Sequence, residues 1–305
     1  MAFYTPSSEI SRAIRLSLPI VALESTVITH GLPYPENLSL ARDMEAAVRD
    51  EGSAPATVAV IAGKVRVGLS DSELEQLART KAVKLSRRDL AAAMLRKTDG
   101  GTTVAGTMFI AHGAGIQVFA TGGIGGVHRD VRFDVSADLQ SLADTPMIVV
   151  CAGAKAILDL PATLEYLETM SVPVVGFQTD DFPAFYSQES GLKVPVRLDS
   201  PEEIVSFAQV HWGAGLHSAV LVTNPVPKEA ALPRDQIDPI IDQASQEAYD
   251  KHIRGQALTP FLLKRITELS GGKSLHANLS LLLNNARLAA LIARSLSASR
   301  RTRHI

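Results

Sequence analysis

Short apolar runs alternate with longer amphipathic segments along the first two thirds of the chain. Runs this short and rich in valine, isoleucine and alanine predict buried strands, here at residues 20–23, 57–62, 65–67, 117–121, 147–151, 172–176, 194–197 and 219–223. The segments between them predict helices at 35–51, 71–79 and 90–97. This alternation predicts an α/β fold with a central, mostly parallel sheet flanked by helices on both faces.

Capping signals support several of these boundaries. Pro35 lies in the first turn of one predicted helix, and Ser70 is a suitable cap for the next. The run from Ser86 to Asp89 has the spacing of a capping box. After residue 223 the pattern is almost wholly helical, and it predicts a helical C-terminal third whose members cover the sheet or build a subunit interface, at 236–252, 260–269 and 274–297.

Neither an internal repeat nor a linker divides the sequence. We therefore expect residues 1–305 to form a single domain. The last residues are locally basic, with three arginines between Arg300 and Arg303. We expect this tail, from about residue 298 onward, to be solvated and disordered.

Composition and charge limit which partners the protein is expected to bind and in which cellular compartment it is expected to occur. A formal charge of −2 and a pI of about 6.5 give no basic surface for nucleic acid. Uninterrupted apolar stretches are too short to span a membrane, and the amino terminus lacks the pattern of a secretion signal. The single cysteine, Cys151, excludes an intramolecular disulfide and a multi-cysteine zinc site, and inside an apolar run it reads as a small core residue. These features predict a cytoplasmic protein.

Lys155 follows the predicted strand at 147–151 through a turn of small residues. In open α/β folds, ligands bind at the carboxyl ends of strands. Burial there favours the neutral, nucleophilic amine, which can form a Schiff base with a carbonyl compound. Taken alone, the position favours the alternative, a lysine that extends from the start of a helix into solvent.

Glu24 ends the first apolar run, just before two hydroxyl side chains. In a partly apolar site such a glutamate can hold its proton near neutral pH and act as a general acid. An exposed loop glutamate is the alternative. His30, in the proline-containing loop that follows, is predicted to be a hydrogen-bonded loop histidine rather than a ligand or base.

Two glycine-rich segments are candidates for anion binding. One is the run from Gly122 to Gly126, and the other is the pair Gly100-Gly101, which precedes Thr103 and an apolar helical run. Glycines let backbone N–H groups approach a phosphate, and a helix N-terminus favours negative charge. Lys84 and the Arg87-Arg88 pair could add positive charge, although the arginines could equally be solvated surface residues.

Asp134 and Asp138, with Ser136 between them, could bind a hard divalent ion through oxygen. Such a site would leave most coordination positions to water. The same spacing also makes an ordinary helix cap, so the residues leave both readings open.

Longer motifs add a resemblance to a known family. The chain resembles the pseudouridine-5′-phosphate glycosidase family, also called indigoidine synthase A-like, from about residue 20 to about residue 293. The likeness is carried by Ala22-Leu-Glu-Ser-Thr, Thr29-His-Gly-Leu-Pro-Tyr-Pro, Lys84-Leu-Ser-Arg-Arg-Asp-Leu, Gly101-Thr-Thr-Val-Ala, Phe119-Ala-Thr-Gly-Gly-Ile-Gly-Gly-Val-His-Arg, Asp134-Val-Ser-Ala-Asp-Leu, Val149-Val-Cys-Ala-Gly-Ala-Lys, Asn224-Pro-Val-Pro, and the stretch from Asn278 to Asn285-Ala-Arg-Leu-Ala. The segment between Arg129 and Asp134 is shorter than the family's usual form.

The resemblance implies a function and a set of site residues. It implies reversible cleavage of the carbon–carbon glycosidic bond of pseudouridine 5′-phosphate to uracil and ribose 5-phosphate, in a homotrimer. Lys155 would be the nucleophile, Glu24 the proton donor and Asp134 the ligand of Mn²⁺. Substrate contacts would come from Lys84, Thr103, Val104, Ser136, Ala137, Asp138 and Asn278.

Other functions fit the same residues. A different Schiff-base lysine enzyme acting on sugar phosphates, such as an aldolase, would share the amine. A non-catalytic phosphosugar or nucleotide sensor would need the anion site but not Lys155. An accessory role in pigment biosynthesis, where relatives of this family occur, is a third option.

Overall fold

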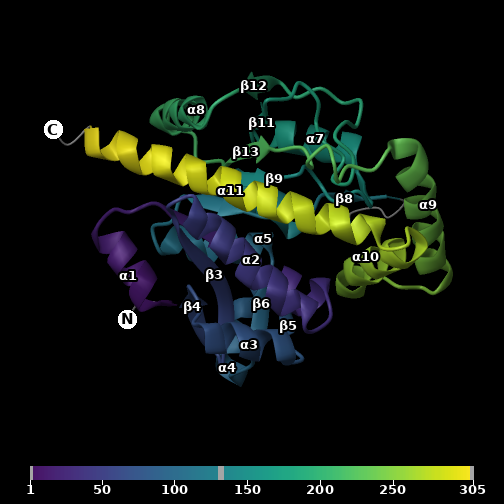
Figure 1. Cartoon of the computed structure of the whole chain (residues 1–305), viewed down its shortest axis with the longest axis horizontal. Coiled ribbons are helices and arrows are strands. Elements are labelled where there is room, and N and C mark those ends of the chain that lie inside the picture. Colours follow the sequence, from purple (N-terminus) through teal and green to yellow (C-terminus); the bar gives the residue numbers. More distant parts are fainter. Residues whose placement is uncertain (1–2, 130–133, 303–305) are drawn as a thin grey trace.

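The computed structural model describes residues 3–129 and 134–302. Its centre is a twisted sheet whose middle strands all run parallel (Figure 1). In spatial order these middle strands are β3 (Ala54–Ile61), β2 (Ile20–Leu23), β7 (Val118–Ala120), β9 (Ile148–Cys151), β13 (Val220–Thr223), β11 (Val174–Phe177) and β12 (Val196–Leu198). The predicted α/β fold with a mostly parallel sheet is confirmed.

The middle of the sheet is buried on both faces. Every residue of β9 and β13 is buried, as expected for parallel strands covered on both sides. Their continuous valine, isoleucine and leucine content explains why these strands were recognisable in the sequence. β9 pairs with β7 on one side and β13 on the other, so it is an interior strand of the sheet.

Helices cover both faces of the sheet. One face carries α2 (Glu36–Asp50), α8 (Pro201–Gly213) and α11 (Lys273–Thr302), and the other carries α5 (Val104–Gly113), α6 (Ala137–Asp144) and α7 (Leu160–Thr169) (Figure 1). The chain leaves β2 toward β3 by way of α2, but leaves β7 toward β9 by way of α6. The winding therefore reverses between β2 and β7, and a crevice at the carboxyl ends of these two strands is the expected ligand site.

One edge of the sheet is antiparallel and less regular. There β3 pairs antiparallel with β4 (Lys64–Val67) and β6 (Gly100–Thr102), and the edge is completed by β1 (Thr5–Pro6) and β5 (Val83–Leu85). The Gly100-Gly101 pair was expected at a helix N-terminus, yet it lies in β6, and α5 begins only after Thr103. Pairing with strands distant in sequence overrides the low strand preference of glycine.

Several short helices and one small two-stranded pair lie outside the middle of the sheet. They are α1 (Ser8–Arg15), the π-helix η1 (Val27–Gly31), α3 (Asp71–Arg79), the 3₁₀ helix η2 (Arg87–Asp89), α4 (Leu90–Arg96), and the short pair β8 (Val127–His128) and β10 (Leu158–Asp159). The expected caps are present, because Ser70 and Glu73 form a capping box at α3 and Ser86 and Asp89 form one at η2.

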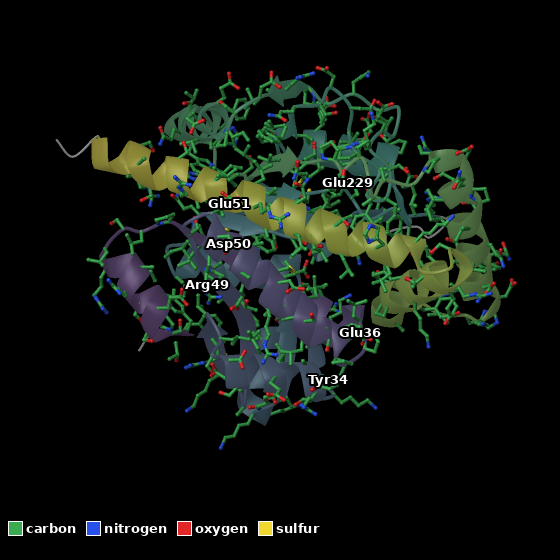
Figure 2. All side chains as sticks on the ribbon, in the orientation of Figure 1. Tyr34, Glu36, Arg49, Asp50, Glu51 and Glu229 are labelled. Atoms are coloured by element: carbon green, nitrogen blue, oxygen red, sulfur yellow. The ribbon has the colours of Figure 1, made fainter. Side chains whose placement is uncertain are left out.

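The last third is helical, as predicted, and comprises α9 (Arg234–Asp250), the 3₁₀ helix η3 (Gly255–Ala257), α10 (Leu258–Leu269) and α11. Figure 2 shows Asp50 and Glu51 at the end of α2 beside α11, and Arg294 donates a hydrogen bond to the carbonyl of Glu51.

The expected disorder from about residue 298 is wrong as far as Thr302, because α11 continues to that residue. Ser299 accepts a hydrogen bond from Gln209 on α8 and so anchors this end. Within the described chain, the helices are all either too short or too polar to cross a membrane.

Candidate active site

A cavity of about 630 Å³ opens at the carboxyl ends of β2, β7 and β9, where the winding of the sheet reverses. Its walls include all the site residues that the family resemblance implied, namely Glu24, Lys84, Thr103, Val104, Asp134, Ser136, Ala137, Asp138, Lys155 and Asn278. These residues come from segments spread over more than 250 positions, and the fold brings them together. Of the two glycine-rich segments expected to bind an anion, Gly122, Gly123 and Gly125 line the cavity, but Gly100 and Gly101 do not.

Glu24 follows β2 directly and is only 8% exposed. Its Oε1 accepts a hydrogen bond from the hydroxyl of Thr121, which follows β7 in the same way. Burial raises the pKa of Glu24, and the nearby Lys155 and the Thr121 hydrogen bond oppose that rise only in part. The carboxyl group is therefore suited to hold a proton nearer neutral pH than an exposed glutamate would.

Lys155 reaches the same cavity from the turn after β9. Gly153 in this turn has φ +85°, and a Cβ atom there would overlap the carbonyl oxygen of Pro183. The turn is fixed further by the hydrogen bond from the Lys155 N–H to the carbonyl of Ile124, at 3.1 Å. Lys155 is half-buried between buried neighbours, so its amine is held in the cavity rather than extended into solvent.

Another part of the cavity lining has features that favour an anion. The N-termini of α5 and α6 both meet the cavity, and their caps, Thr103 and Ser136, accept hydrogen bonds from backbone N–H groups of their own helices. Lys84, on β5, lies beside them. Burial and the charge of Lys155 lower the pKa of Lys84, and a bound anion would favour its charged form again.

The carboxylate of Asp138 joins these two helices to the glycine-rich loop. Its Oδ1 accepts from the N–H of Ala105 at 3.0 Å, and its Oδ2 accepts from the N–H of Gly125 at 2.8 Å. A Cβ atom on Gly125 would overlap the side chain of Ser136. Close packing therefore requires glycine at position 125, and both oxygens of the Asp138 carboxylate are engaged by backbone N–H groups.

Asp134 faces the cavity from the segment before α6. Residues 3–129 and 134–302 contain no group of three or more histidine, cysteine, aspartate or glutamate side chains that could hold a metal ion. Asp134 is therefore not part of such a cluster among these residues. One carboxylate fits a hard divalent ion that keeps most of its water ligands, as Mg²⁺ and Mn²⁺ do. The preceding segment, 130–133, lies outside the described residues.

Several other sequence interpretations are settled by contacts. His30 lines the cavity, and its Nδ1 is 2.7 Å from the hydroxyl of Thr29, as expected for a hydrogen-bonded loop histidine. Arg87 forms an ion pair with Asp144 at 2.8 Å on the rim of the cavity. Cys151 is fully buried in β9, and burial raises its pKa to about 12, so it is a core residue and not a nucleophile.

Sequence reasoning did not single out Thr121 or His128 as site residues. Thr121 touches Glu24, and His128 lines the cavity from β8. The position of Thr121 at the end of an apolar run, just before four glycines, was a usable signal. α10 also contributes to the cavity through Thr259, Pro260 and Leu263, which belong to a further motif of the family resemblance, Thr259-Pro-Phe-Leu-Leu, but had no site role assigned from the sequence.

Comparisons with known proteins agree with this geometry. The sequence profile of the family described as indigoidine synthase A like protein matches residues 9–295. The chain is 56% identical over 296 residues to the pseudouridine-5′-phosphate glycosidase of Paracoccus denitrificans, covering 95% of this chain and 97% of that one. It is 55% identical over 298 residues to the enzyme of the same name from Geobacillus kaustophilus, covering 97% and 99% of the two chains.

Solved structures give the same result. An indigoidine synthase A-like protein from Thermotoga maritima superposes with a TM-score of 0.89 at 36% identity, covering 97% of both chains. The prealnumycin C-glycosynthase AlnA, solved with ribulose 5-phosphate, superposes with a TM-score of 0.91 at 40% identity over 99% of both chains. The chain therefore belongs to the indigoidine synthase A-like family of pseudouridine-5′-phosphate glycosidases.

Proposed function

We propose that this enzyme cleaves pseudouridine 5′-phosphate reversibly into uracil and ribose 5-phosphate through an imine on Lys155. The observation that carries the proposal is the pairing, in one cavity, of an amine at the end of β9 with a buried glutamate whose pKa is raised. The names of relatives that are more than half identical support the substrate. A non-catalytic sensor is set aside because those relatives are enzymes.

The chemistry explains why an amine is needed. Uracil is joined to C1′ of pseudouridine through carbon, so the leaving atom carries no lone pair that an acid could protonate before departure. A pair of carboxylates, which serves ordinary glycosidases, gives too little help here. An amine on C1′ supplies the electron pair that expels a carbon leaving group, because its nitrogen can become an iminium.

The steps balance with Lys155 and Glu24 alone. Protonated Glu24 gives its proton to the ring oxygen while the neutral Lys155 amine attacks C1′, and the bond from C1′ to the ring oxygen breaks. The new ammonium returns a proton to Glu24. The nitrogen lone pair then forms the iminium, the bond from C1′ to uracil C5 breaks, and C5 takes the proton from Glu24. Water adds to the iminium, the proton that this step releases returns to the Glu24 carboxylate, and ribose 5-phosphate leaves the free amine.

The phosphate is assigned to the wall formed by Lys84 and the N-termini of α5 and α6. Backbone N–H groups near Val104 and Ala137 and the positive ends of two helix dipoles favour a dianion there. Asn278, on α11, faces the cavity as a further substrate contact. Binding of the phosphate would position C1′ next to the Lys155 amine. This positioning would raise the rate of attack because the two reacting atoms are already held together.

Asp134 is our proposed ligand for one Mn²⁺ ion per subunit, the other ligands being mostly water. When bound, the ion would supply positive charge near the substrate. We expect one Mn²⁺ to bind per chain, as measured by electron paramagnetic resonance on the protein without substrate. The Asp134→Ala variant should bind none, and Asp242→Ala, which removes an exposed carboxylate outside the cavity, should bind one. Unchanged binding by Asp134→Ala would refute the assignment.

The imine is tested by trapping. Incubation with ribose 5-phosphate and borohydride should add one reduced, ring-opened ribose phosphate per chain, and mass mapping of peptides should locate it on Lys155. Lys84→Ala protein serves as the comparison, because its adduct should remain on Lys155 although more sugar phosphate is needed. An adduct confined to any lysine other than 155, or no adduct, excludes the mechanism.

The homotrimer and the cytoplasmic location remain predictions. Light scattering measures the first, since each chain has a mass of 32.5 kDa. Fractionation of the cells that produce the protein measures the second.

A further inference from the structure

A buried chain of amides connects α11 to the catalytic edge of the sheet. Asn285, on α11, is fully buried, and its Nδ2 donates to the carbonyl oxygen of Thr121 at 2.8 Å and more weakly to that of Gly122 at 3.4 Å. Asn224, which follows β13 and is 6% exposed, donates from its Nδ2 to Oδ1 of Asn285 at 3.1 Å. Both asparagines belong to motifs that the catalytic scheme leaves without a role.

The connection fixes the orientation of the Asn285 amide. Its oxygen is engaged by a donor from Asn224, so its NH₂ group must face the two carbonyls at the end of β7. Asn224 is itself anchored, because its backbone N–H donates to the carbonyl of Cys151 at 2.8 Å. Three neighbouring strand ends, those of β13, β9 and β7, are thus tied to one side chain.

The backbone of Thr121 is held on two sides. Its N–H donates to the carbonyl of Val150 at 3.0 Å, and its carbonyl accepts from Asn285. The close approach of α11 depends on Gly122, where a Cβ atom would lie 3.1 Å from a methyl group of Leu282. With its peptide fixed, Thr121 presents its hydroxyl to Oε1 of Glu24.

We infer that Asn285 is a positioning residue, which holds the Thr121 peptide so that the Thr121 hydroxyl keeps its hydrogen bond to Glu24. This inference rests on the proposed role of Glu24 as the acid. Asn285 does not line the cavity, so it acts through Thr121 and not on the substrate.

The inference predicts the direction of an effect on the acid. The Thr121 hydrogen bond stabilises the charged carboxylate, as does Lys155, while burial and Asp138 oppose that form and Lys84 favours it weakly. Loosening Thr121 removes one of the favourable contacts and leaves the others in position. Glu24 should then hold its proton to higher pH.

The experiment compares Asn285→Leu with Asn284→Leu. Asn284 is the preceding residue on the same helix. It donates to the carbonyl of Pro225 at 3.2 Å and makes no hydrogen bond to Thr121. Carboxyl-labelled glutamate followed by NMR, with the Glu24 signal assigned from Glu24→Gln, gives the titration midpoint without substrate. In Asn285→Leu this midpoint should rise by about one pH unit, and the basic limb of kcat/KM should move up with it. In Asn284→Leu both should stay at the wild-type value.

A double variant separates positioning from a general loss of stability. Thr121→Val removes the hydroxyl and should raise the midpoint, and adding Asn285→Leu to it should raise the midpoint no further, because both changes act on one hydrogen bond. The inference is overturned if the Glu24 midpoint is unchanged in Asn285→Leu. It is also overturned if the two shifts add in the double variant. If Asn285→Leu does not fold, Asn224→Ala can replace it, because it removes the donor that orients the Asn285 amide. The Glu24 midpoint should then also rise. An unchanged midpoint in Asn224→Ala would contradict the inference. The NMR readout stands even if pseudouridine 5′-phosphate is not the substrate.

Discussion

Lys155→Ala is expected to lower kcat for release of uracil from pseudouridine 5′-phosphate by a factor on the order of 10⁴ or more. The physical reason is that Lys155 is the amine assigned to bond to C1′ and to donate the electron pair that expels carbon, whereas Lys84, the other amine in the described cavity, is assigned to the phosphate. Release of uracil, followed by chromatography under saturating substrate, measures the effect. The fold should be retained, because the turn after β9 is held by backbone hydrogen bonds and by Gly153.

The matched control is Lys64→Ala, which removes an exposed lysine from β4, outside the cavity. Its kcat should equal that of the wild type. If Lys155→Ala keeps turnover within about tenfold of the wild type, the lysine is not the nucleophile, because loss of a covalent step costs far more than that.

Glu24→Gln is expected to lower kcat by about 10²–10⁴-fold, the usual contribution of a positioned general acid. Glutamine is nearly the same size and can still accept the Thr121 hydrogen bond, so binding of ribose 5-phosphate should change little. The wild-type enzyme should be active below the raised pKa of Glu24 and lose kcat/KM as pH rises through it. That basic limb should be absent from the residual activity of the variant.

Stability supplies a second measurement on the same variant. Because folding raises the pKa of Glu24, the unfolded chain ionises first, and the free energy of unfolding falls as pH rises from the ordinary glutamate value to the folded one. Urea titrations should therefore show Glu24→Gln gaining stability over the wild type across that interval.

Glu45→Gln is the matched control for both measurements. Glu45 is also buried, its pKa is also raised by burial, and it accepts a 2.6 Å hydrogen bond from Thr57, but it lies outside the cavity. It should show the stability gain without any change in the pH profile of catalysis. A wild-type pH profile in Glu24→Gln would contradict the role of Glu24 as the acid.

Local signals explain which elements were predictable. The expected strand at 20–23 and the helix at 71–79 match β2 and α3, since the first is a continuous buried run and the second begins at a capping box. α8 carries an equally clear capping box between Ser200 and Glu203, yet it was not predicted. β6 could not be predicted, because nothing within Gly100–Thr102 favours a strand except its pairing with β3 and β5.

The site residues also differ in whether a local sequence signal reveals them. Glu24 was recognisable because it ends an apolar run, and Lys155 because it follows one through a short turn of small residues, while family motifs named the other candidate residues. The engagement of Asp138 with two backbone N–H groups was hidden, because its partners lie 33 and 13 positions away. The link from Asn224 to Asn285 spans 61 positions and has no local pattern, so only the folded arrangement reveals it.

The length of α11 has a consequence for synthesis. This helix, about 45 Å long, starts at the cavity and crosses the sheet to its opposite end, where Ser297 donates to the carbonyl of Ser17. A nascent chain interrupted before residue 273 would already contain Glu24 and Lys155, yet it would lack Asn278 and Asn285. Lys155 therefore leaves the ribosome before α11 does, and the walls of the cavity are complete only once the last helix has been made.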